Sequence, residues 1–90
     1  MPHLDTLTAS DFEALRGQLF RIADAFVAEL VEVNEVPRES SGRAPFSLVF
    51  EGGPSPPLPQ AIYAVHHERL GAMEIFLVPI APDRYEAVFT

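Results

Sequence analysis

The sequence predicts a mainly β fold, a small antiparallel barrel or two-layer roll of about six strands with one short N-terminal helix. The last third of the chain supports this most clearly, because short turn signals separate three strand-like runs at 60–67, 72–79 and 84–90. This spacing is typical of an antiparallel meander. Three earlier runs are also predicted as strands: 18–22, 26–36 and 45–51.

Residues 9–16 are predicted to form the helix. Thr8 is a good N-cap, and Asp11 stands three residues later, which resembles a capping box with Asp in place of Glu. Gly17 suits the left-handed position that ends a helix. A helix of about two turns is stable only when it packs against something, so we expect Phe12 and Leu15 to face the body of the protein.

The run 26–36 is predicted as one long strand, because its valines favour a strand over a helix. Strict alternation between the two faces fails at Leu30 and Val31. We therefore expect a β-bulge at this point. The polar stretch 37–44 and the Gly- and Pro-rich stretch 52–59 are expected to be loops.

The chain has 90 residues, which fits a single domain over 1–90 with a thin core. Its 13 acidic and 6 basic residues leave a formal net charge of −7, which disfavours binding to nucleic acids and to anionic membrane surfaces. No apolar run reaches the roughly 18 residues that a membrane-spanning helix needs. No secretory signal is visible either, so we expect a cytoplasmic protein unless it is exported as part of an assembly.

The sequence contains no pattern that predicts a catalytic, cofactor or metal site. His66 and His67 are neighbours on a predicted strand, so their side chains point to opposite faces and cannot chelate one ion together. We expect one of them to be exposed and the other to form a hydrogen bond with a turn, the alternative being a catalytic His66. Ser40 to Gly42 is not a nucleophile elbow, and Glu51 to Pro54 is not a phosphate loop. We therefore expect no enzyme, no cofactor and no metal, although residues distant in sequence could still converge.

The alternation of side chains along the strands predicts a second apolar surface outside the main core. Alternation along the strands predicts that its residues are Val49, Phe76, Val78 and Val88. Soluble monomers seldom expose large contiguous apolar patches, so something is expected to cover it. Two interpretations remain open: the N-terminal helix covers it with Phe12 and Leu15, or a protein partner or a second copy of the chain does. A strand at the edge of the sheet is a further docking template.

Gln60, Tyr63 and His66 form the alternative candidate site. Tyr63 has an apolar body and a polar tip, and with Gln60 and His66 it could frame a shallow pocket for a small ligand at the mouth of the barrel. The competing interpretation is that these side chains tie the loops to the barrel. The first hypothesis is therefore a non-catalytic interaction or assembly module, and the alternative is a small-ligand-binding β-barrel.

Several motifs along nearly the whole chain resemble a family of uncharacterised small bacterial domains. The resemblance rests on an N-terminal Leu-Thr-x-x-Asp-Phe motif and on later motifs at Phe46–Phe50, Leu58–Gln60 with Tyr63, His66 with Leu70-Gly71, Phe76–Pro79 and Tyr85–Phe89. Such domains are often encoded beside phage-tail-collar-like proteins, which implies a role in a tail-like or surface fibre assembly. The family has no known catalytic residues to carry over to this chain.

Overall fold

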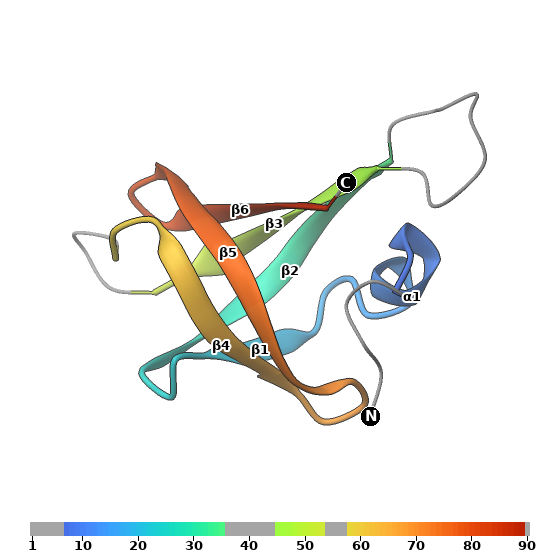
Figure 1. Cartoon of the computed structure of the whole chain (residues 1–90), viewed down its shortest axis with the longest axis horizontal. Coiled ribbons are helices and arrows are strands. Elements are labelled where there is room, and N and C mark those ends of the chain that lie inside the picture. Colours follow the sequence, from blue (N-terminus) through green and yellow to red (C-terminus); the bar gives the residue numbers. More distant parts are fainter. Residues whose placement is uncertain (1–6, 36–44, 54–57, 90) are drawn as a thin grey trace.

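The computed structural model describes residues 7–35, 45–53 and 58–89. Its elements are α1 (Ala9–Glu13), β1 (Leu19–Ile22), β2 (Phe26–Glu35), β3 (Phe46–Gly52), β4 (Ala61–His67), β5 (Gly71–Ala81) and β6 (Arg84–Phe89). All strand pairs are antiparallel, and the sheet closes into a barrel in the order β1-β2-β3-β6-β5-β4 (Figure 1). The predicted fold class is confirmed, and of the two predicted architectures the structure is the barrel.

Period-two alternation places the strands as the sequence predicts. In β3, Phe46, Leu48 and Phe50 are buried inside the barrel, and each described strand boundary lies within two residues of its prediction. The β2 register shifts between Leu30 and Glu32, which confirms the predicted bulge. Such a bulge bends and twists a strand, which helps a six-stranded sheet to close. The predicted loop 37–44, with Ser40 to Gly42, and residues 54–57 lie outside the described residues.

The barrel closes through two short seams. At one seam β1 pairs with β4 only through Arg21 opposite His66 and Ile22 opposite Val65. At the other, the pairing of β5 with β6 runs from Val78 opposite Glu86 to Ala81 opposite Arg84, with a register shift in between. Beyond these pairs the neighbouring strands diverge, as expected for a small, strongly twisted barrel (Figure 1).

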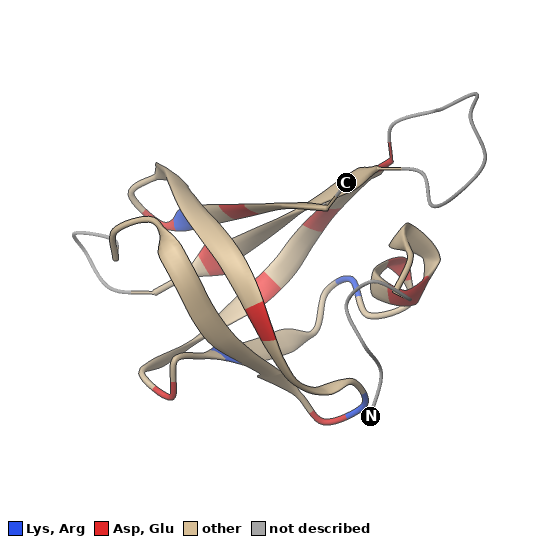
Figure 2. Ribbon diagram, viewed as in Figure 1, with Lys and Arg blue, Asp and Glu red and all other residues tan. Residues whose placement is uncertain are grey.

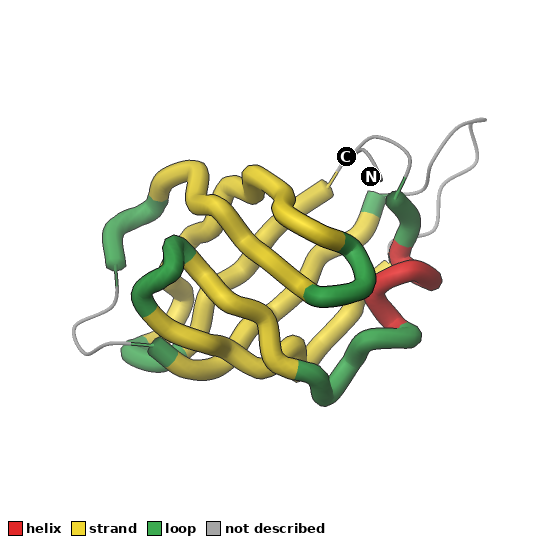
Figure 3. The backbone as a smooth tube through the Cα atoms, turned by 90° about the horizontal axis from the view of Figure 1, so that it is seen from below, coloured by secondary structure: helices red, strands yellow, loops and turns green. Residues whose placement is uncertain are grey.

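The helix α1 closes one end of the barrel (Figure 3). The Phe12 ring is fully buried, with its centroid 5.8 Å from that of Phe46 and 5.6 Å from that of Phe89. The backbone N–H of Thr8 donates to Asp11 Oδ2 over 2.8 Å, as the predicted capping box requires. Leu15 belongs to the same interior cluster. The helix is therefore an end plug of the core.

The helix is shorter than the predicted 9–16. After Glu13 the backbone bonds tighten to an i to i+3 pattern, with Leu15 N–H donating to the carbonyl of Phe12. Gly17 then adopts φ +90°, and its N–H donates to the carbonyl of Leu30 in β2. The last predicted turn of helix is lost because the chain is already pairing with the barrel wall.

The interpretation that the helix covers the second apolar surface is wrong. Phe12 and Leu15 point into the barrel interior and are 0% and 2% exposed. Phe76 and Val88, on the outside of the barrel, remain 50% and 63% exposed. A short helix can bury only one apolar stripe, and here that stripe packs into the open end of the barrel.

Candidate functional site

An exposed apolar surface lies on the outside of β4, β5 and β6. We call it the outer apolar face, and it consists of Ile62, Phe76, Val78 and Val88. Ile62 and Phe76 stand directly opposite each other in the β4–β5 register and are 66% and 50% exposed. Val78 is half-buried and stands opposite Glu86, and Val88 is the next outward residue on β6. Three predicted residues therefore point outward here, with Val88 beyond the last β5–β6 pair, and Ile62 adjoins Phe76 from β4.

Sequence reasoning missed Ile62, although the outward alternation of Ile62, Ala64 and His66 along β4 was available to find it. The pairing of Ile62 with Phe76 depends on the β4–β5 register, which the length of the Glu68–Leu70 turn determines. Ile80, further along β5, is also 49% exposed. The apolar side of β5 thus extends beyond the residues that parity singled out.

Val49, the fourth predicted residue of this surface, contributes almost no exposed area. It points outward from β3 but is only 4% exposed. Arg84 on β6 forms an ion pair with Glu51 on β3, with 3.0 Å between Nη2 and Oε2, and reaches Glu32 on β2 with 3.6 Å between Nη1 and Oε2. Its side chain therefore crosses β3 beside Val49, whose register partners are Glu32 and Glu86. This charged bridge keeps Val49 out of the outer apolar face.

Acidic side chains border the outer apolar face. Glu74 precedes Phe76 by two residues on β5, and Glu86 stands opposite Val78. Neither carboxylate takes part in an ion pair within the described part of the chain. Figure 2 shows acidic residues along the strands, whereas the arginines lie near turns and strand ends. The rim of the face is thus negatively charged.

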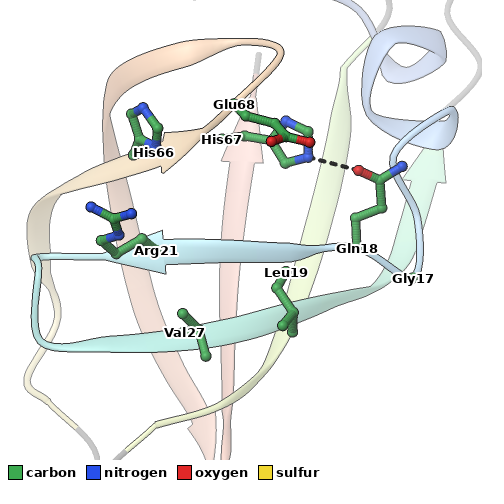
Figure 4. Close-up of a pocket in the computed structure, with 8 residues that line it drawn as sticks. All are labelled: Gly17, Gln18, Leu19, Arg21, Val27, His66, His67 and Glu68. Atoms are coloured by element: carbon green, nitrogen blue, oxygen red, sulfur yellow. Dashed lines mark hydrogen bonds between the residues drawn. The ribbon is translucent and has the colours of Figure 1, made fainter.

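A cleft of about 490 Å³ lies on a different side, where β1 and β4 diverge (Figure 4). Exposed Leu19 and Val27 provide apolar surface, and Arg21 and His66 face each other across the seam. Its lining residues are Gly17, Gln18, Leu19, Arg21, Val27, His66, His67 and Glu68. Arg21 Nη1 is also 3.7 Å from Asp24 Oδ1, so the charge of Arg21 is partly compensated.

The two histidines behave as the sequence predicts. His66 is exposed, whereas His67 is 3% exposed and packs against Phe20 with ring centroids 4.6 Å apart. The Arg69 N–H donates to His67 Nδ1 over 3.0 Å, so the ring proton resides on Nε2 and is donated to Gln18 Oε1 over 2.8 Å. Burial lowers the pKa of His67 below its usual 6.5. His67 is therefore a neutral structural group that ties the β4–β5 turn to Gln18, the residue before β1.

The structure does not bring Gln60, Tyr63 and His66 together. Tyr63 and His66 point to opposite faces of β4, and Gln60 is exposed just before that strand. The Tyr63 hydroxyl donates to the Pro59 carbonyl, which ties the preceding loop to the barrel. This geometry matches the interpretation of a loop tie for Tyr63 alone, since Gln60 and His66 are exposed.

The described residues contain no group of three or more His, Asp or Glu side chains that could hold a metal ion. Within the same residues, no helix is long and apolar enough to cross a membrane.

These features define a closed, six-stranded antiparallel β-barrel with a helical end plug and an exposed apolar outer face. The chain belongs to the family described as Domain of unknown function (DUF6916), whose profile matches residues 7–89. No curated protein and no solved structure matches the chain.

Proposed function

We propose that this protein is a non-catalytic interaction or assembly module that docks through its outer apolar face. The observation that carries the proposal is the cross-strand pair of Ile62 and Phe76, both of which project into solvent from the outside of the barrel. Paired aromatic and β-branched side chains on an exposed face are the kind of anchor on which interfaces depend. The closed barrel favours this face over an edge strand as the docking element.

The proposed partner is part of a larger assembly. The resemblance of the chain to small bacterial domains encoded beside phage-tail-collar-like proteins favours a tail-like or surface fibre assembly. An acidic surface suits such an accessory protein, because a net charge of −7 keeps the unassembled chain soluble despite its apolar face.

The test compares two exposed apolar side chains on different sides of the barrel. Phe76→Ser removes the centre of the outer apolar face, and Leu19→Ser removes a 61% exposed side chain that lines the cleft. Each tagged variant is expressed in the native host, and co-purified proteins are quantified against wild type by mass spectrometry. We expect Phe76→Ser to lose a specific partner that Leu19→Ser retains, with both variants folded by circular dichroism. Recovery of the same partners with Phe76→Ser would refute the proposal.

A second candidate function is small-ligand binding, which the cleft at the β1–β4 seam favours. Its volume of about 490 Å³ lies within the range of small-molecule sites, and it combines apolar walls with the polar groups of Arg21 and His66. A thermal-shift screen tests it, because a ligand at a hundred times its dissociation constant adds about 2.7 kcal/mol of stability. A genuine ligand loses its shift with Leu19→Ser and keeps it with Phe76→Ser. The absence of any shift across a broad library would count against this candidate.

A further inference from the structure

We infer that the partner of the outer apolar face is a protein surface whose apolar side chains are flanked by Arg or Lys, and not a second copy of this chain. The inference rests on the proposed function and specifies the chemistry of the partner. It follows from the charges that border the face.

The two border carboxylates lie within reach of any partner that covers the apolar centre. Glu74 and Phe76 project from the same side of β5 two residues apart, which corresponds to about 7 Å along a strand. Glu86 is in register with Val78 on the neighbouring strand. Both separations are shorter than the screening length of about 8 Å at physiological ionic strength. A partner side chain that contacts Phe76 or Val78 therefore places the adjacent residues of the partner close to the carboxylate of Glu74 or Glu86.

Within the described residues, no cation forms an ion pair with either carboxylate. Arg84 stands two residues before Glu86 on the outward face of β6, but its guanidinium reaches away from β5 to Glu51 on β3 and Glu32 on β2. Those two carboxylates already exceed its single charge. On β4 the outward residues nearest the carboxylates are Ile62 and Ala64, which carry no charge. His66 lies towards the far end of the strand, opposite Arg21. Complementary charge must therefore come from the partner.

A second copy of the chain is a poor occupant for the same reason. A two-fold symmetric contact places the same patch on both sides of the interface. It would bring together the carboxylates of Glu74 and Glu86 from two chains, each with a formal net charge of −7. Like charges brought together across an interface suppress association, whereas cations beside an apolar centre both attract the partner and select it.

The experiment titrates the full chain with three synthetic peptides and follows backbone amides by NMR. The peptides share one central Leu-Phe-Ile segment and differ only in flanking residues, which are Arg, Gln or Glu. We expect the Arg peptide to shift the amides of Ile62, Glu74, Phe76 and Glu86, and to bind about fivefold more tightly than the Gln peptide. Raising NaCl from about 50 mM to about 300 mM should weaken that preference, because the screening length falls from about 14 Å to about 6 Å.

Two sets of variants separate the inference from the proposed function. The double variant Glu74→Gln/Glu86→Gln should lose the preference for the Arg peptide, whereas the control Glu29→Gln/Glu68→Gln, which removes two exposed carboxylates elsewhere, should keep it. Equal binding of the Arg and Gln peptides to wild type, or an unchanged preference in Glu74→Gln/Glu86→Gln, overturns the inference and leaves the docking face intact. Unchanged binding of every peptide to Phe76→Ser overturns the docking face itself.

Sedimentation of the free chain tests whether a second copy of the chain covers the outer apolar face. We expect a monomer at both salt concentrations. A dimer that Phe76→Ser abolishes and that added salt strengthens would show that a second copy covers the face, and it would overturn the inference.

Discussion

Replacement of Phe12 by Ala tests whether the helix is part of the core. The Phe12 side chain is 0% exposed, and its ring contacts those of Phe46 and Phe89 at the open end of the barrel. Truncating a buried Phe to Ala costs about 3–5 kcal/mol. Because two ring–ring contacts are lost at a site lined by separate strands, we expect a value near the middle of that range, about 4 kcal/mol.

This loss is large for so small a domain, because a chain of this size has a free energy of unfolding of roughly 5–15 kcal/mol. The measurement is equilibrium unfolding in urea, followed by far-UV circular dichroism. We expect the transition midpoint to fall steeply while the slope with urea stays close to that of wild type. If Phe12→Ala is too unstable to study, Phe12→Leu provides a milder version, with an expected loss of about 1–2 kcal/mol.

Phe76→Ala is the matched control, because it removes the same side chain from a site that is 50% exposed. We expect it to cost less than about 1 kcal/mol, since most of the ring is already in contact with water. Equal losses for Phe12→Ala and Phe76→Ala would refute the assignment of Phe12 to the core and of Phe76 to the outer surface.

Three further changes test individual contacts. Burial lowers the pKa of His67 below 6.5, so the fold favours the neutral ring and the free energy of unfolding should fall as the pH drops below 6.5. The fall should be smaller in His67→Gln. An equal pH dependence of the two proteins in urea titrations would contradict this. Gly53→Ala should cost about 1–2 kcal/mol, because Gly53 has φ +99° and an added Cβ would lie 2.8 Å from the Phe26 ring; an unchanged urea midpoint would disprove the strain. Tyr85→Phe should cost about 1–2 kcal/mol, because the buried hydroxyl accepts the Leu58 N–H over 2.7 Å; a more stable variant in thermal unfolding would show that this bond does not stabilise the loop.

Sequence patterns determined the features that depend on near neighbours. Period two assigned the strands and the face of each residue, so the opposite directions of His66 and His67 followed from parity alone. The failure of alternation at Leu30 and Val31 located the bulge. The outward direction of Phe76 and Val88 followed from the same rule, whereas their exposure did not, because Val49 also points outward and is only 4% exposed.

Only the tertiary structure decided which of these faces meet. The helix fills the end of the barrel because β3 and β6 bring Phe46 and Phe89 together there, 43 residues apart along the chain yet directly paired. Arg84 shields Val49 because β2, β3 and β6 lie in that order in the sheet, and Gln18 reaches His67 because β1 closes on β4. Local alternation specifies to which side of a strand a residue points. Strand order and barrel closure, which depend on contacts between distant segments, specify what stands on that side.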